Sequence, residues 1–205
     1  MIEKIKSLIH KYFHTKKPLS IISDFVFIIL VVLLIIPGTR KDVASFFIRL
    51  TSFAPSELST GEQYTIRPET KTWSFSSLSG KEVVFDEFLD KPVFINIWAT
   101  WCPPCIAELP GIKKLYTEYK GKVNFILLSD EPDSTINKFI IARKYQGLPF
   151  YRYNSIPQDF STRSIPASYI ISKYGKVVLK KKGAASWDSG KVKALLDELI
   201  KMKKP

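Results

Sequence analysis

The pentapeptide Trp101-Cys-Pro-Pro-Cys105, where an apolar run ends and a helical pattern begins, restricts the fold more than any other feature. Its cysteines, Cys102 and Cys105, are the only two among 205 residues. Residues three apart on a helix lie on one face, with about 5–6 Å between their Cβ atoms. A disulfide joins residues whose Cα atoms are about 4.4–6.8 Å apart, so this pair can form one. A bridge that closes so short a loop adds little stability. The pair is therefore better suited to redox chemistry than to stapling the fold, although an inert bridge is the alternative.

An α/β domain is predicted over residues 63–205. An apolar strand leads into the cysteine pair, and strands and helices then alternate before a hairpin and a closing helix. This order predicts a mixed central sheet with helices on both faces. The predicted elements are a strand pair at 73–76 and 83–85, strand 92–99, helix 103–119, strand 123–128, helix 135–145, strand 150–153, a hairpin of 167–172 and 176–179, and helix 189–202.

A run of twelve apolar residues, Phe25–Ile36, precedes this domain. Extended to residues 19–37 and wound as a helix, it would measure about 28 Å, close to the hydrocarbon thickness of a bilayer. We therefore expect a single transmembrane anchor at 19–37. A cleaved signal peptide and a buried core helix are the alternatives. The charges that follow Pro37, and the lack of a cleavage site of small residues, favour the uncleaved anchor.

The charges that flank this run predict its orientation. Five lysines lie before it and three cations after it, at Arg40, Lys41 and Arg49. The more positive side faces the cytoplasm. We thus expect a single-pass protein of the cell (inner) membrane with a cytoplasmic N-terminus and a periplasmic, or otherwise extracytoplasmic, catalytic domain. Residues 1–18 would form an amphipathic segment on the inner leaflet, and residues 38–62 a juxtamembrane helix and linker.

Three groups of residues resemble one known family. They are Asn96 to Cys105 (NIWATWCPPC), Glu108 with Pro110 downstream, and Ser164-Ile-Pro-Ala167 before a strand. They resemble the thioredoxin family, specifically its membrane-tethered TlpA/ResA-like branch, over residues 70–200. The resemblance implies a thioredoxin-like fold with an N-terminal strand extension. It also implies a thiol–disulfide oxidoreductase that needs no dissociable cofactor.

Each residue of the motif then has an expected role. At the helix N-terminus the dipole favours the thiolate of Cys102. We expect this sulfur to be exposed and to attack a target disulfide, and Cys105 to resolve the mixed disulfide. Glu108 would be partly desolvated, which raises its pKa toward the range for proton transfer with Cys105. A solvent-facing glutamate is the alternative.

Pro166 resembles the cis-proline that faces the cysteine pair in this fold, and an ordinary trans proline is the alternative. It would leave the backbone groups of Ile165 available to an extended substrate. Trp101 is expected to be exposed and to line the same contact surface, whereas Trp98 is expected in the core.

The two prolines between the cysteines remove backbone donors from the vicinity of the Cys102 sulfur. This favours a disulfide reductase over an oxidase or isomerase. A thiol peroxidase and a tethered partner-binding module are two further functions that the same fold could serve.

Composition and the resemblance together suggest the partners. The net charge is +12, but no basic block alternates with aromatic residues, so no nucleic-acid partner is expected. Both histidines, His10 and His14, precede the apolar run, so no metal site is expected in the domain. Expected partners are disulfide-bearing proteins, a membrane electron-donor protein and the lipid bilayer. The resemblance also suggests apocytochrome c as a target.

Overall fold

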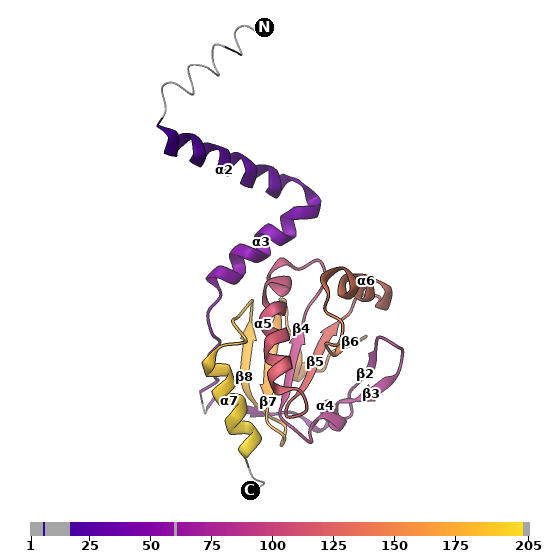
Figure 1. The fold of residues 1–205 in the computed structure, drawn as a ribbon. Helices are drawn as coiled ribbons and strands as arrows, with labels where there is room; N and C mark the ends of the chain where they lie inside the picture. The colour runs from indigo at the N-terminus through magenta and orange to yellow at the C-terminus, as the bar shows by residue number, and fades with distance from the viewer. Residues whose placement is uncertain (1–5, 7–16, 60, 203–205) are drawn as a thin grey trace. The chain divides into compact units, whose positions relative to one another are not determined.

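The computed structural model describes residue 6 and residues 17–59 and 61–202 (Figure 1). The chain divides into two compact units, Met1–Val43 and Ala44–Pro205. Helix α3 (Pro37–Thr51) contains this division, which falls inside the segment predicted as a juxtamembrane helix and linker. Residues that precede the predicted domain thus pack with it.

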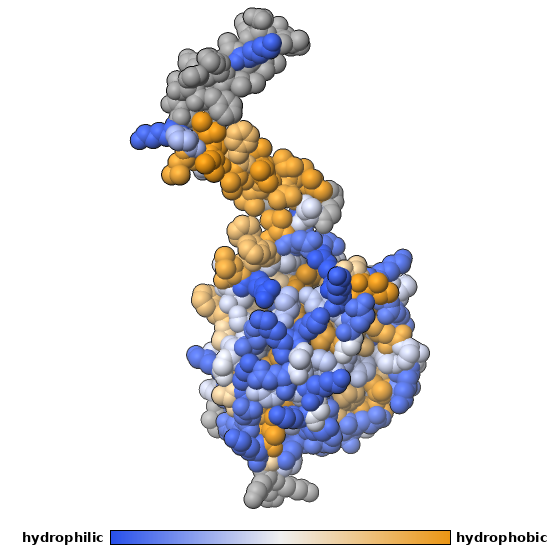
Figure 2. Space-filling view, in the orientation of Figure 1, coloured by the Kyte–Doolittle hydropathy of each residue, from blue (hydrophilic) through white to orange (hydrophobic). Residues whose placement is uncertain are grey.

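In the first unit, helix α2 (Pro18–Ile35) begins with a proline at its first turn, where proline is tolerated because no hydrogen bond is lost. Apolar side chains cover it, and most are exposed (Figure 2). Over the described part of the chain, no helix is both long and apolar enough to cross a membrane. The structure does not confirm the transmembrane anchor predicted at residues 19–37. The amphipathic segment predicted over residues 1–18 lies almost wholly outside the described residues.

A sheet of eight strands forms the centre of the second unit, in the order β1-β8-β7-β4-β5-β6-β2-β3. β4 is parallel to β5 and antiparallel to β7, so the sheet is mixed, as predicted. Their bounds are β1 Tyr64–Thr65, β2 Ser74–Ser77, β3 Glu82–Val84, β4 Val93–Ile97, β5 Asn124–Ser129, β6 Phe150–Arg152, β7 Ala167–Ile171 and β8 Lys176–Lys182.

Three long helices, α5 (Pro103–Tyr119), α6 (Asp133–Arg143) and α7 (Gly190–Lys201), follow strands β4, β5 and β8, as predicted. Figure 1 shows α5 in front of the central strands. All three contribute to one hydrophobic cluster, together with Phe94 and Trp98. The prediction of helices on both faces is thus only partly correct. A second hydrophobic cluster lies on the opposite face of the sheet. Shorter elements pack there, among them the 3₁₀ turns η1 (Phe85–Phe88) and η2 (Gln158–Phe160) and the residues beside helix α4 (Pro68–Lys71).

The alternation of side chains along β4 positions the site. All five of its residues are buried, and Val93, Ile95 and Ile97 belong to the cluster opposite the long helices. Because successive strand residues point to opposite faces, Asn96 points with Phe94 toward the side of α5. The side-chain amide of Asn96 is thereby buried on the face of the sheet that α5 covers.

Candidate active site

The cysteine pair occupies the N-terminus of α5, as predicted. Cys102 is the N-cap residue, and its sulfur accepts a hydrogen bond from the amide of Cys105 at 3.3 Å. The two cysteines form a disulfide with a Cα–Cα distance of 5.3 Å. Pro103 and Pro104 occupy the first helical turn, where the missing N–H groups have no helical partner. The structure therefore holds the oxidised form of the pair at a helix end that favours a thiolate.

The prediction that Cys102 is exposed is wrong for this form. Cys102 is 3% exposed and Cys105 is 0% exposed, while the neighbouring Trp101 is 59% exposed, as predicted. Two backbone segments contact this end of α5. The Cys102 sulfur lies 3.8 Å from the Ile165 carbonyl oxygen, and Ser45 of α3 donates a hydrogen bond to the Pro103 carbonyl at 2.7 Å. Short-range sequence patterns do not show such cover from distant segments.

The Ile165–Pro166 peptide bond is cis, as predicted. The β7 ladder begins at Ala167, so Ile165 stands outside the sheet beside the Cys102 sulfur. The Pro166 carbonyl accepts a hydrogen bond from Gly183. The backbone of Ile165 thus forms one rim of the site.

Glu108, one turn beyond Cys105, is 3% exposed, so the solvent-facing alternative is excluded. Its Oε1 accepts a hydrogen bond from Asn96 at 2.7 Å. Its Oε2 accepts one from the Trp187 indole at 2.8 Å and one from the Ala185 amide at 3.3 Å. Burial raises the pKa of Glu108 to about 8, and these three donors act in the opposite direction. A carboxyl with such a pKa can take up or release a proton near neutral pH.

Asn96 connects this carboxyl to the sheet. Its side-chain amide nitrogen also donates to the Ser168 hydroxyl, which is directly opposite on β7. Its Oδ1 is buried, and the described residues offer it no hydrogen-bond partner. A protonated Glu108 needs an acceptor for its O–H, and rotation of the amide would provide one. Asn96 can thus match either protonation state of Glu108.

A second carboxylate fixes the approach to the cysteines. Glu131 accepts hydrogen bonds from the Thr100 amide at 2.6 Å and from its hydroxyl at 2.7 Å. Thr100 stands two residues before Cys102, so Glu131 holds the turn between β4 and α5.

Sequence reasoning missed Trp187, Glu131 and the amide of Ala185. Trp187 lies in a loop of small residues just before the Ser189 cap of α7, which gives no periodic signal. Asn96 has a visible signal, because it is a polar residue inside an otherwise apolar strand. The strand pattern alone does not show that its amide meets Glu108.

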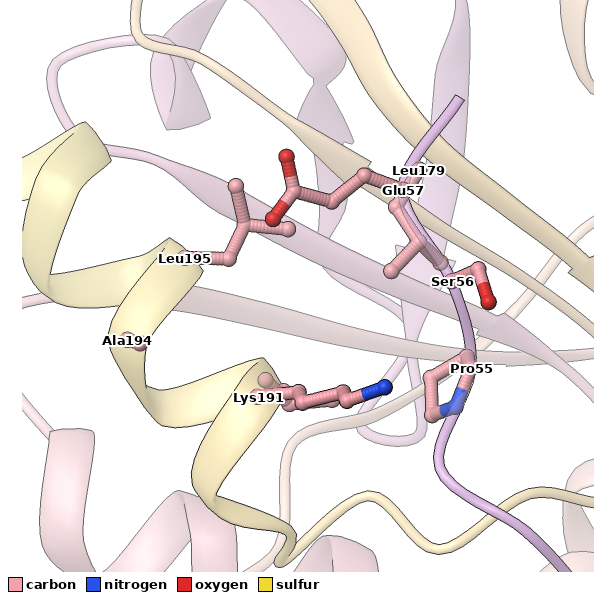
Figure 3. Close-up of a pocket in the computed structure, with 8 residues that line it drawn as sticks. Pro55, Ser56, Glu57, Leu179, Lys191, Ala194 and Leu195 are labelled. Carbon is pink, nitrogen blue, oxygen red and sulfur yellow. The ribbon is translucent and has the colours of Figure 1, made fainter. Parts of the chain in front are cut away.

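A separate cavity lies elsewhere on the domain. It has a volume of about 310 Å³, between residues 55–57, β8 and α7. Figure 3 shows the Lys191 ammonium and the Glu57 carboxylate beside it. Its lining includes neither the cysteines nor Glu108 nor Ile165, so it does not belong to the site at the tip of α5.

The comparisons with known proteins agree with this geometry. The Redoxin family model matches residues 67–199. The chain is 34% identical over 128 residues to the thiol-disulfide oxidoreductase ResA of Bacillus thuringiensis subsp. konkukian, covering 60% of this chain and 72% of that one. It is 31% identical over 134 residues to ResA of Halalkalibacterium halodurans, covering 62% and 71%.

Among solved structures, MTB dsbF superposes with a TM-score of 0.56 at 20% identity. The match covers 65% of this chain and 99% of that one, which supports the thioredoxin-like fold. The chain therefore belongs to the Redoxin family, within its ResA-like group of thiol–disulfide oxidoreductases.

Proposed function

We propose that the protein is a disulfide reductase of other proteins, in which Cys102 and Cys105 carry two electrons and Glu108 carries a proton. The observation that carries this proposal is the buried Glu108 carboxyl, held by three donors one turn beyond Cys105 on the same helix. Positions three apart on a helix are neighbours at about 5–6 Å. A buried acid with a pKa of about 8 in that position suits proton exchange with a thiol.

In the reduced protein, the Cys102 thiolate attacks one sulfur of the target disulfide. That S–S bond breaks, a mixed disulfide forms, and the displaced target thiolate takes a proton from solvent. Cys105 then gives its proton to the Glu108 carboxylate and attacks the Cys102 sulfur. The mixed disulfide breaks, the second target thiolate leaves, and the Cys102–Cys105 disulfide forms. The target gains two electrons and the cysteine pair loses two.

Cys102 is 3% exposed in the oxidised form, so its sulfur must become accessible when the pair is reduced or when a target docks. The Ile165 backbone, outside the β7 ladder, offers groups with which an extended peptide can pair. Trp101, the neighbour of Cys102 in the chain, offers an exposed aromatic surface. We infer that these residues form the rim to which the target binds.

Trapping tests this function. In Cys105→Ala the mixed disulfide cannot resolve, so Cys102 is expected to remain linked to its targets, which can be identified by mass spectrometry. Cys102→Ala is the matched control and should trap none. Equal capture by both variants would favour a binding module over an enzyme. Rapid turnover of hydrogen peroxide by the wild type would favour a peroxidase.

The direction of transfer is tested by the reduction potential. Pro103 and Pro104 provide no amide donors near the Cys102 sulfur, which limits stabilisation of its thiolate. We therefore expect a value well below the roughly −120 mV typical of strong oxidants. A value near that figure would indicate an oxidase.

The location and the partners form the final part of the proposal. The apolar run Phe25–Ile36 supports a membrane tether with the catalytic domain outside the cytoplasm. Electrons would then come from a membrane protein, and apocytochrome c is a candidate target. Alkaline extraction of membranes and reporter fusions at residue 205 test the tether and its orientation. Loss of cytochrome c in a Cys102→Ser strain would support the target.

A further inference from the structure

A narrow cleft of about 30 Å³ reaches Glu108. A water molecule needs roughly 10–15 Å³ of such space and two to four polar partners, so the cleft has room for one or two. It has the polar partners as well. Its lining includes Arg49, Ser52, Gly111, Ser186 and Asp188, besides Glu108.

These lining residues connect a buried acid with the surface. Glu108 is 3% exposed, whereas Arg49 is exposed and the Asp188 side chain is 33% exposed. Asp188 is also paired with Lys114 at 3.2 Å. The other sides of the Glu108 carboxyl are taken by Asn96, Trp187 and the Ala185 amide.

One wall of the cleft is formed by Arg49, near the end of α3, and by Ser52 just after it, and hydrogen bonds fix this wall to the domain. Ser186 donates its amide to the Phe53 carbonyl at 3.0 Å and its hydroxyl to the Ser52 carbonyl at 2.9 Å. Ser45, which lies earlier in α3, donates a hydrogen bond to the Pro103 carbonyl. Residues 49–52 thus hold a defined position beside Glu108, although they precede the Redoxin match at residues 67–199.

We propose that this cleft is the route by which the Glu108 carboxyl exchanges its proton with solvent, and that residues 49–52 belong to the active site because they form one of its walls. The inference rests on the proposed function, in which Glu108 exchanges a proton with Cys105. When a small dithiol reduces the pair, one of its thiolates attacks Cys102, the Cys102–Cys105 bond breaks, and a mixed disulfide with Cys102 forms while the departing Cys105 sulfur takes a proton from Glu108. Glu108 regains a proton from water in the cleft. The second thiolate of the dithiol then displaces Cys102 as a thiolate and closes a cyclic disulfide, so the dithiol loses two electrons and the cysteine pair gains two.

Gly111 offers a way to obstruct the cleft. A Cβ at this position would lie 3.2 Å from the Asp188 carboxylate. Gly111 is helical and its φ is not positive, so alanine fits its backbone without strain. Gly111→Ala therefore places a methyl group in the cleft, and Gly111→Ser places a hydroxyl there that can pass a proton. Gly190→Ala is the matched control, because it adds a methyl group to a helix where nothing lies within 4 Å.

The test is the rate at which dithiothreitol reduces the oxidised 205-residue protein, followed by tryptophan fluorescence at pH 6 and pH 9. At pH 6 Glu108 already holds its proton, so Gly111→Ala should react at the wild-type rate. At pH 9 the proton must first arrive through the cleft. There Gly111→Ala should be roughly 3- to 30-fold slower, part of the ~100-fold or more that a general acid contributes. Gly111→Ser should recover much of this loss, and Gly190→Ala should match the wild type.

The inference is overturned if folded Gly111→Ala matches the wild type at pH 9, is slowed equally at both pH values, or is no slower than Gly111→Ser. Glu108→Gln separates this failure from that of the proposed function. If Glu108→Gln also reacts at the wild-type rate, Glu108 carries no proton and the proposed mechanism fails. If Glu108→Gln is slow while Gly111→Ala is not, only the cleft is excluded.

Discussion

The raised pKa of Glu108 makes the stability of the oxidised protein depend on pH, and Glu108→Gln should remove that dependence. In the unfolded chain this carboxyl ionises near the ordinary value of 4.5, and in the folded protein near about 8. The folded state therefore holds more protons between these values, and its free energy of unfolding falls as pH rises. The contribution of Glu108 is fully present below pH 4.5 and is lost by about pH 8.

The size of the loss follows from the two pKa values. One pH unit corresponds to about 1.4 kcal/mol per proton, so the whole window is worth roughly 5 kcal/mol. Between pH 5 and pH 8 the part expected is roughly 3–4 kcal/mol. Because Glu108 is 3% exposed, solvent screening does not reduce this figure much.

Urea unfolding of the oxidised protein at pH 5, 6, 7 and 8 measures this loss. The difference in unfolding free energy between the wild type and Glu108→Gln should shift steadily with pH, in favour of the variant at higher pH. Glu198→Gln, an exposed glutamate on α7, is the control and should follow the wild type. Parallel curves for the wild type and Glu108→Gln would refute the assignment of a raised pKa to Glu108.

Three further substitutions test the surroundings of the site. Trp187→Phe removes the indole donor that favours the Glu108 carboxylate, so the pKa of Glu108 should rise further, seen as a shift to higher pH in the same unfolding series. Ser45→Ala removes the hydrogen bond to the Pro103 carbonyl, which is worth about 0.5–1.5 kcal/mol. Because α3 would then cover the cysteine pair less firmly, a bulky phosphine should reduce the disulfide roughly 2- to 10-fold faster. An unchanged rate would show that α3 does not cover the pair. Glu131→Gln cannot accept from both groups of Thr100, and the stability measured in urea should fall by about 1–3 kcal/mol.

The local parts of the site were predictable from sequence, and the long-range parts were not. The strand before the cysteine pair, the helix that begins at Pro103 and the cis bond before Pro166 all follow from short patterns with a known resemblance, although β4 ends at Ile97, two residues before the predicted end. The burial of Cys102 depends on residues as distant as Ser45, and no periodicity relates the two segments.

The hydrogen bond from Trp187 to Glu108 is also beyond local patterns, because it joins residues 79 positions apart. Strand β1, with two residues, is too short to produce a recognisable alternation. Burial of Glu108 was expected from its helical spacing, but its three donors come from a strand and a loop that only the fold brings together.

The sheet ends at both outer edges in a very short strand, β1 with two residues and β3 with three. Long, flat edges are templates on which other chains can add strands and aggregate. Edge strands this short present few unpaired backbone groups, so the domain offers other chains little on which to add a strand.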